Sequence, residues 1–401
     1  MRKEAAMWAL KSKNLVFLII CNLLPALTVF AAPVKYQLDD TGLVIEGVSG
    51  TNPIIYDNDW FNDTTDHFYL WAKASLGRAN LRGTIVSRDM WGWQKGYLYK
   101  LQQGMETARK AVDIARRSGL KNIPAPVAGC DRVFVRPQSG KIEETKVVIS
   151  KGGELIVAEA KKASPEKPLL VFVGGPLNTV ANAYLMDTSI AERMIVFMTD
   201  LRGYNGKDKW ANYIVAKRCK LVNYGAHIWW PQRPQPPVMP LERFDDLPKN
   251  ELTEEMFRIA KMFWDRSTRK DNPVRDDGFG DGAPVFLVFD PKTWTQVQPQ
   301  KVTGVFELKD VAATEGFDLL DARDCNYSRM SKEFFVLMKN ARVYGANRPE
   351  NPHVRAAFPL KVSDNHRYLV DKNNHAFLIH GDTPWEIAWR LTKEEALTHM
   401  D

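Results

Sequence analysis

The sequence predicts an α/β fold built on a doubly wound, mostly parallel sheet with helices on both faces. From about residue 53, short apolar runs alternate with segments of helical periodicity, a pattern typical of parallel sheets. The apolar runs lack the in–out alternation of half-exposed strands, so both faces of each strand are expected to be buried. The chain has 401 residues, 45% hydrophobic and 26% charged, which suits one large globular domain or two.

The predicted elements follow one another in regular order. The apolar runs that predict strands are residues 54–56, 81–86, 169–173 and 194–198. The segments that predict helices are residues 65–76, 105–117, 154–163, 180–186 and 252–266. Gly77 and Gly119 follow two of these helices and Pro165 follows a third, as helix-terminating residues do.

The N-terminus has the pattern of a secretory signal peptide. Four basic residues and one acidic residue lie in positions 1–13, an uncharged and largely apolar stretch follows in 14–32, and small residues close it. An uncleaved membrane anchor is the alternative, which Pro25 and the short apolar run disfavour. We therefore expect residues 1–32 to be cleaved, the mature protein to be secreted or periplasmic, and no stable membrane insertion to remain.

Charge and cysteine content exclude two other classes of protein. Removal of residues 1–32 lowers the formal net charge from +7 to +4, and no basic block is interleaved with aromatic residues, so no nucleic-acid partner is expected. Cys130, Cys219 and Cys325 remain, which is too few for a disulfide framework. The fold is expected to be held by its core.

An acidic turn is the most informative segment of the chain. Asp57, Asp59, Asp63 and Asp66 lie directly after a predicted strand and before a predicted helix. In an open α/β sheet, this turn falls at the carboxyl end of the strand, where ligands bind. Clustered carboxylates repel one another unless a cation offsets their charge. The alternative is a solvated loop whose aspartates cap the helix.

About residues 45–340 resemble the inosine-uridine-preferring nucleoside hydrolases. The acidic turn matches the hallmark of that family, and residues 81–87 resemble its second strand. Gly175-Pro176-Leu177-Asn178-Thr179 resembles its Gly-Pro-Leu-Thr-Asn turn, and Tyr204-Asn205 with Asp208 resembles a substrate-contacting segment. The resemblance implies calcium-assisted hydrolysis of an N-glycosidic bond in a small-molecule nucleoside or related glycoside.

The resemblance also implies roles for individual residues. Asp59 would be both a Ca²⁺ ligand and the general base for a calcium-bound water. The remaining Ca²⁺ ligands would be Asp66, the main-chain carbonyl of Asn178, and Asp281. The residues implied to bind substrate are Asp57, Asp63, Asn205 and Asp208. For Asp281, a turn residue among glycines is the alternative.

Two departures from the family pattern leave the substrate open. Thr65 replaces an aspartate of the acidic turn, and Gly280 stands where purine-preferring members place a histidine that protonates the leaving group. His67 and His227 are candidate substitutes, with a packed or surface histidine as the alternative for each.

The C-terminal segment resembles the beginning of the apiosidase-like glycoside hydrolases. Residues 367–379 predict a hairpin with its turn at 371–374, and Gly381-Asp382-Thr383-Pro384-Trp385 follows. That family forms a (β/α)₈ barrel of roughly 250 residues, whereas 20 residues follow Gly381. The expected division is a signal peptide (1–32), a nucleoside hydrolase-like domain (33–344), a linker (345–354) and an incomplete barrel start (355–401), without glycosidase activity in the last part.

Three functions remain compatible with the sequence. The leading hypothesis is an exported, metal-dependent hydrolase of nucleosides or related glycosides. The second is a catalytically inactive, calcium-stabilised module that binds carbohydrate or nucleoside. The third is a truncated part of a two-domain, polysaccharide-degrading glycoside hydrolase. Homo-oligomerisation is left open.

Overall fold

The computed structural model describes most of the chain between residues 32 and 345 and a few residues beyond. The described residues are 32–59, 66–88, 101–199, 201, 208–224, 238–266, 283–305, 307–345, 360–363, 369–370, 372 and 376–377. The chain divides into two compact units between Gly345 and Ala346.

A nine-stranded sheet forms the centre of the first unit, with the order β10-β9-β11-β8-β7-β6-β3-β4-β5. Its strands are β3 (Pro53–Asn58), β4 (Asn80–Val86), β5 (Pro126–Ala128), β6 (Leu169–Val173), β7 (Met194–Thr199), β8 (Lys220–Tyr224), β9 (Trp294–Gly304), β10 (Glu307–Asp310) and β11 (Leu319–Cys325). From β5 to β11 all neighbours pair in parallel, whereas β9 pairs antiparallel with β11 and β10. The predicted α/β class with a mostly parallel sheet is confirmed.

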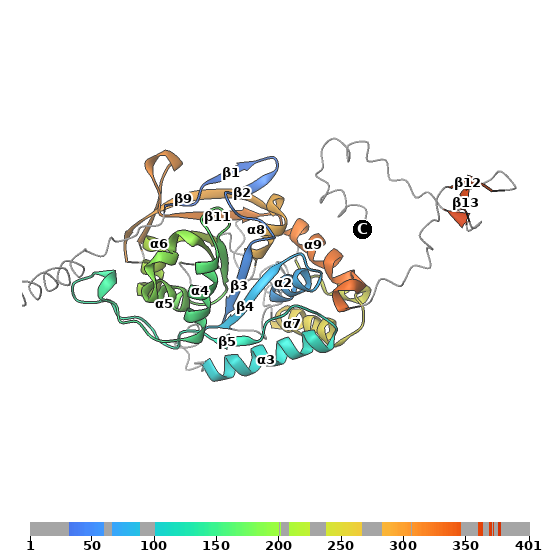
Figure 1. Ribbon diagram of the computed structural model, residues 1–401, viewed down its shortest axis with the longest axis horizontal. Helices are drawn as coiled ribbons and strands as arrows, with labels where there is room; N and C mark the ends of the chain where they lie inside the picture. The colour runs from blue at the N-terminus through green and yellow to red at the C-terminus, as the bar shows by residue number, and fades with distance from the viewer. Residues whose placement is uncertain are drawn as a thin grey trace, which may run out of the picture. The chain divides into compact units, whose positions relative to one another are not determined.

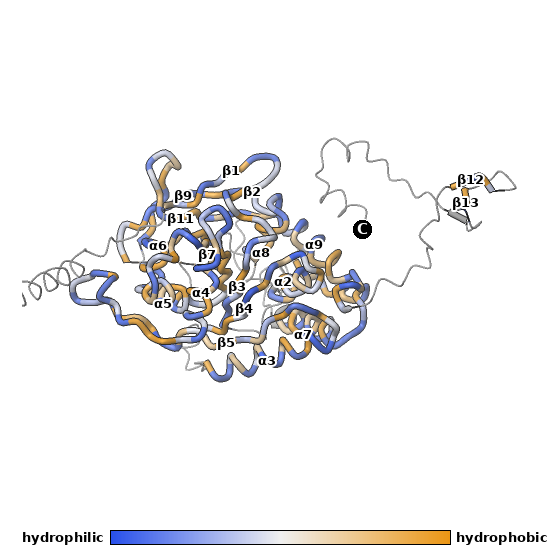
Figure 2. Tube along the Cα trace, in the orientation of Figure 1, coloured by the Kyte–Doolittle hydropathy of each residue, from blue (hydrophilic) through white to orange (hydrophobic). Residues whose placement is uncertain are grey.

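Helices cover both faces of this sheet (Figure 1). One face carries α2 (Asp66–Ser75), α3 (Leu101–Arg117), α7 (Glu251–Arg266), α8 (Val285–Phe289) and α9 (Tyr327–Lys339). The other carries α4 (Lys151–Lys162), α5 (Asn178–Met186) and α6 (Lys209–Arg218). Ile54 and Tyr56 of β3 pack into the first core and Ile55 into the second, because successive side chains of a strand point to opposite faces. In Figure 2 hydrophobic and hydrophilic stretches alternate along the helices, as expected for helices with one buried face.

The predicted strands and helices all occur, with ends that differ by a few residues. Gly77 and Gly119 follow α2 and α3 with φ of 71° and 95°, a left-handed conformation that glycine adopts readily. The Ser150 hydroxyl caps α4 by accepting a hydrogen bond from the Gly153 amide. Local sequence signals therefore place these elements well.

Several elements were not predicted from the sequence. They are β5, β8, β9, β10, β11, α6, α9 and a hairpin made of β1 (Tyr36–Asp39) and β2 (Gly42–Ile45). The apolar run 285–289 forms the short helix α8. The proline-rich stretch 229–237 lies outside the described residues.

The second unit contains a small antiparallel sheet. Its strands are β12 (Lys361–Val362), β13 (Leu369–Val370) and β14 (Ala376–Phe377), in the order β12-β13-β14. Leu369 pairs with Phe377 and Val370 with Ala376, as expected for a hairpin that turns between them. The Gly381–Trp385 motif lies outside the described residues.

In the part of the chain that the structure describes, no helix is long and apolar enough to cross a lipid bilayer. Cys130, Cys219 and Cys325 are all buried free thiols.

Candidate functional site

The strand order creates a switch point beside β3. The chain runs from β3 outward through β4 to β5, and then returns to place β6 on the other side of β3. In open α/β sheets, ligands bind outside the carboxyl ends of the strands at such a reversal. Asp57 and Asp59 at the end of β3 therefore lie at the position where this fold class forms a ligand site.

Asp59 packs against the turn that follows β6. Asp59 directly follows β3, and 6% of its surface is exposed. A Cβ atom placed on Gly175 would lie 3.0 Å from Cγ and 3.1 Å from Cβ of Asp59. The structure thus places the acidic turn, which follows β3, against the Gly-Pro turn, which follows the neighbouring strand β6.

Asp57 lies inside the sheet and is completely buried. Its Oδ1 accepts a hydrogen bond from the Ser87 hydroxyl, and its main-chain carbonyl accepts one from the Gly174 amide at 2.8 Å. Burial raises the pKa of Asp57 to about 7, although the Ser87 and Thr179 hydroxyls oppose this rise. These contacts join the ends of β3, β4 and β6. Asp57 therefore helps to hold the carboxyl ends of these three strands together.

Asn178 connects α5 to the segment after β5. It is the first residue of α5, and its Nδ2 donates to the main-chain carbonyls of Cys130 at 2.8 Å and Arg132 at 3.2 Å. Its side-chain Oδ1 is buried and has no hydrogen-bond partner among the described residues. Buried oxygen acceptors usually have a partner, and a bound cation or water would supply one here.

Asp208 is used by the fold itself. Its Oδ1 accepts from the Ala211 amide as the N-cap of α6, and its Oδ2 accepts from the Phe134 amide, both at 2.9 Å. Burial raises the pKa of Asp208 to about 6, against the lowering effect of these two hydrogen bonds. The family resemblance implied that Asp208 binds substrate, whereas the structure shows both of its carboxylate oxygens accepting from main-chain amides.

His67 lies in an aromatic part of the core. It is buried on α2 with ring centroids 4.0 Å from Phe68, 4.9 Å from Trp71 and 6.3 Å from Tyr56. Burial lowers the pKa of His67 to about 3, so its imidazole is neutral near pH 7. A neutral, enclosed imidazole does not act as a cationic acid towards a leaving group.

The remaining predicted site residues are described only in part. Asp66 is the first residue of α2, at the end of the acidic turn, and its side chain lies outside the described part. Asp63, Asn205 and Asp281, together with Thr65, Gly280 and His227, also lie outside it.

Sequence reasoning missed a polar pair at the centre of the sheet. Asn223 Nδ2 donates to Asp321 Oδ1 at 2.7 Å between the parallel strands β8 and β11, while Asn223 Oδ1 accepts from the Leu201 amide at 2.9 Å. Leu201 directly precedes the segment that contains Asn205. The signal was an asparagine within the otherwise apolar strand 221–224, where an unpaired amide would be costly to bury.

The donor atoms of the site suit a hard cation such as Ca²⁺, which binds carboxylate and carbonyl oxygens. Within the described ranges, no group of three or more His, Cys, Asp or Glu side chains forms a metal site. Of the residues expected to supply ligands, those ranges include the Asp59 side chain and Asn178, whereas the side chains of Asp66 and Asp281 fall beyond them.

Comparisons with known proteins gave no sequence match but several structural ones. No protein-family model and no curated protein matches the sequence. A plant nucleoside hydrolase has 13% identity and a TM-score of 0.48, covering 72% of this chain and 99% of its own. A purine-preferring ribonucleoside hydrolase from Gardnerella vaginalis has 14% identity and a TM-score of 0.49. The match covers 73% of this chain and 98% of the hydrolase. An inosine-uridine-preferring nucleoside hydrolase from Bacillus anthracis has 14% identity and a TM-score of 0.41. The match covers 72% of this chain and 99% of the hydrolase. These values are too low to assign a function, which has to be argued from the residues themselves.

Proposed function

We propose that this protein hydrolyses the N-glycosidic bond of nucleosides, or the corresponding bond of related small glycosides, at the carboxyl edge of β3 and β6. One observation carries the proposal. Asp59 leaves β3 at the switch point of a parallel sheet and packs against Gly175 of the turn after β6. The resemblance of the acidic turn to nucleoside hydrolases points to the same edge.

Asp59 is the group that does the acid–base work in this proposal. A carboxylate accepts the proton of an attacking water as the water bonds to the anomeric carbon, while the glycosidic bond breaks and its electron pair leaves with the base or aglycone. Asp59 is nearly enclosed, with 6% of its surface exposed, so bulk water competes little with the reacting water. The side chains of Asp63 and Asn205 would bind sugar hydroxyls and orient the ring.

A cation at this site would be held by Asp59, Asp66, Asp281 and the main-chain carbonyl of Asn178. When bound, Ca²⁺ supplies positive charge that orients sugar hydroxyls and makes water more acidic. The protein's own contribution is to keep the oxygens in place. Asp57 contributes by joining β3 to its two neighbouring strands: its carboxylate accepts from the Ser87 hydroxyl after β4, and its main-chain carbonyl accepts from the Gly174 amide after β6.

The leaving group sets the substrate range. Among the residues that the structure describes, His67 was the candidate acid, and it is buried and neutral. A leaving group that departs without protonation should therefore be favoured over one that needs it. We expect p-nitrophenyl riboside, whose phenolate is a stable anion, to be hydrolysed faster than inosine.

The decisive experiment measures reducing-sugar release by the full chain from a panel of nucleosides and p-nitrophenyl glycosides, with calcium and with EDTA. Asp59→Asn should lower turnover by about 10³-fold or more, since it removes the base but keeps the shape of the side chain. Asp40→Asn, a change at an exposed residue of the β1–β2 turn, is the matched control and should leave turnover unchanged.

Two results would contradict the proposal. One is wild-type-like activity of Asp59→Asn, which would remove Asp59 from the reaction. The other is a folded wild-type protein that releases no sugar from any member of the panel in either metal condition.

A second function is favoured by the state of His67. If no residue outside the described part supplies a leaving-group acid in its place, the protein would bind its ligand without turnover, as a calcium-stabilised carbohydrate- or nucleoside-binding module. Isothermal titration separates the two functions, because such a module would bind a nucleoside or sugar with saturation and release no product over hours.

Export is a separate proposal that rests on residues 1–32. Expression of the full chain with mass-spectrometric determination of the mature N-terminus tests it. A mature protein that begins near residue 33 is expected, and retention of Met1 in a membrane fraction would indicate an anchor instead.

A further inference from the structure

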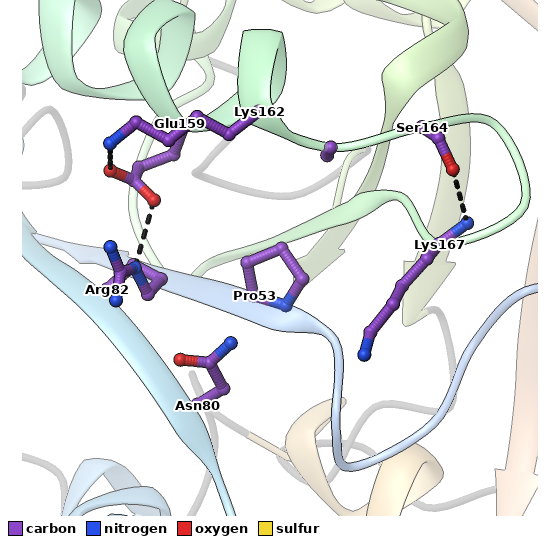
Figure 3. Close-up of a pocket in the computed structure, with 8 residues that line it drawn as sticks. Pro53, Asn80, Arg82, Glu159, Lys162, Ser164 and Lys167 are labelled. Atoms are coloured by element: carbon purple, nitrogen blue, oxygen red, sulfur yellow. Dashed lines mark hydrogen bonds and ion pairs between the residues drawn. The ribbon is translucent and has the colours of Figure 1, made fainter.

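A hollow at the amino-terminal edge of the sheet collects cationic side chains. It has a volume of about 370 Å³ and lies at the opposite end of β3 from Asp59. Pro53 and Asn80, the paired first residues of β3 and β4, form its floor, and the end of α4 with the loop after it forms its other wall (Figure 3). This hollow is therefore distinct from the proposed catalytic edge.

The charge balance of the hollow is positive. Its lining contains the cations Arg82, Lys162 and Lys167 and the single carboxylate Glu159. Glu159 accepts from Arg82 Nε at 3.0 Å and from Lys162 Nζ at 2.6 Å. Burial acts to raise the pKa of Glu159, but these two hydrogen bonds outweigh it and lower the pKa, so Glu159 stays ionised and fixes both cations.

Donor groups remain unused around the hollow. Arg82 uses only Nε in the described contacts, which leaves the two terminal nitrogens of its guanidinium. The Lys167 ammonium makes no hydrogen bond or ion pair with any described residue, and its side chain extends towards Pro53 and Asn80 in Figure 3. The exposed Asn80 amide is likewise available.

The carbonyl end of α4 does not oppose an anion here. Helix C-termini carry partial negative charge on their last carbonyls. Arg193 Nη1 donates to the carbonyls of Lys161 and Ala163 at 3.1 and 3.4 Å, so a further cation neutralises this end.

We propose that the hollow binds a small phosphate-type dianion, either free phosphate or a phosphomonoester. A guanidinium and an ammonium that approach from separate elements are the usual protein ligands of phosphate oxygens. A neutral ligand would leave these charges unmatched. A neighbouring hollow of about 460 Å³ shares Asn80 and Arg82 and reaches Asn122, which gives room for the organic part of an ester.

Titration calorimetry of the full chain with inorganic phosphate, at ionic strength held constant with sodium chloride, tests the proposal. Lys167→Met removes a charge without breaking a described contact and should raise the Kd about tenfold, the effect of losing one charge-assisted hydrogen bond. Lys151→Met is the matched control. Lys151 is exposed at the start of α4, far along the helix from Lys162, and its replacement should leave the Kd unchanged.

The outcomes are distinct. Equal weakening by both lysine variants would show non-specific charge attraction and overturn the proposal, as would the absence of saturable binding to the wild type. Ribose 5-phosphate that binds more tightly than inorganic phosphate would identify a phosphomonoester ligand, and equal affinity would identify the free anion. Asp59→Asn should bind phosphate like the wild type, so this test is independent of the proposed catalytic function.

Discussion

Gly175 and Asp59 approach each other so closely that a methyl group on Gly175 would crowd Asp59. The hypothetical Cβ of Gly175 lies 3.0–3.1 Å from three Asp59 atoms, closer than nine in ten real Cβ contacts. Any side chain at position 175 would therefore have to shift Asp59 by a few tenths of an ångström. Neither sequence segment by itself could have predicted this contact, because it depends on the two segments lying side by side in the fold.

Gly175→Ala should displace Asp59 and lower turnover by about 10²-fold, because catalytic groups tolerate little misplacement. Kinetic assays of the purified variant measure this. Gly316→Ala is the control: Gly316 has φ of 73° and open space around it, so alanine there costs about 1 kcal/mol of stability through backbone strain alone. Normal kcat in Gly175→Ala would show that Asp59 is not positioned by this contact.

Asp208 predicts a pH dependence of stability. Its folded-state pKa of about 6 lies above the ordinary value of 3.8. A carboxyl whose pKa is raised by folding contributes stability below the unfolded pKa, and this contribution is lost as the pH rises through the folded pKa. The stability that Asp208 contributes should therefore be lost as the pH rises from about 4 to about 6.

Asp208→Asn removes this titration and one of the two oxygen acceptors. The variant should be less stable than the wild type by about 1–3 kcal/mol at pH 4.5, because one main-chain amide loses its partner. The difference should shrink at pH 8, where the wild type carries a buried charge. Urea unfolding at the two pH values measures it, and a difference that grows with pH would contradict the assigned pKa direction.

At the scale of elements, Asn182 of α5 holds the long connection between β5 and α4. Its Oδ1 accepts from the Val148 amide at 2.9 Å, and its Nδ2 donates to the Val148 carbonyl. The side-chain amide thus replaces a strand partner for this stretch of chain. Asn178, one helical turn earlier, binds the carbonyls of Cys130 and Arg132 in the same connection.

Asn182→Ala should release residues near 148 while the sheet stays folded. The loss of both hydrogen bonds should lower the free energy of unfolding by about 1–3 kcal/mol. Hydrogen exchange should accelerate at the Val148 amide and stay slow in β6. Asn80→Ala, at an exposed asparagine without a described side-chain hydrogen bond, is the control. Unchanged exchange at Val148 would show that other contacts hold the connection.

At the scale of the whole molecule, the last residues of the first unit complete its core. Val343 is fully buried and its carbonyl accepts from the Ser75 hydroxyl at 2.7 Å. The Tyr344 hydroxyl donates to the Met338 carbonyl at 2.9 Å, and the Tyr344 main chain packs against Gly119. The boundary between Gly345 and Ala346 thus follows directly on core residues.

A chain ended at Gly345 should unfold cooperatively, and one ended at Asn340 should be less stable by about 2–4 kcal/mol, from the lost burial of Val343 and the lost hydrogen bonds. Denaturant unfolding of the two truncated chains measures the difference. Equal midpoints would show that residues 341–345 add nothing to the core.

The sequence by itself determined the elements whose signals are local. The apolar runs of β3, β4, β6 and β7 and the periodic helices α2, α3, α4, α5 and α7 were predicted, because burial on both faces or on one face leaves a pattern in consecutive residues. The acidic turn, too, could be placed at the carboxyl end of a strand. The less periodic elements, such as α6 and β9, carried no comparable signal.

Only the tertiary structure decided which of these segments meet. The strand order put β6 beside β3 and so joined Gly175 to Asp59, and it paired Asn223 with Asp321 from strands about a hundred residues apart. It also buried His67 among aromatic rings and turned both Asp208 oxygens towards main-chain amides. The physical reason is that desolvation and hydrogen bonding depend on distant neighbours, and the same aspartate or histidine is a catalyst, a cap or a core residue according to what encloses it.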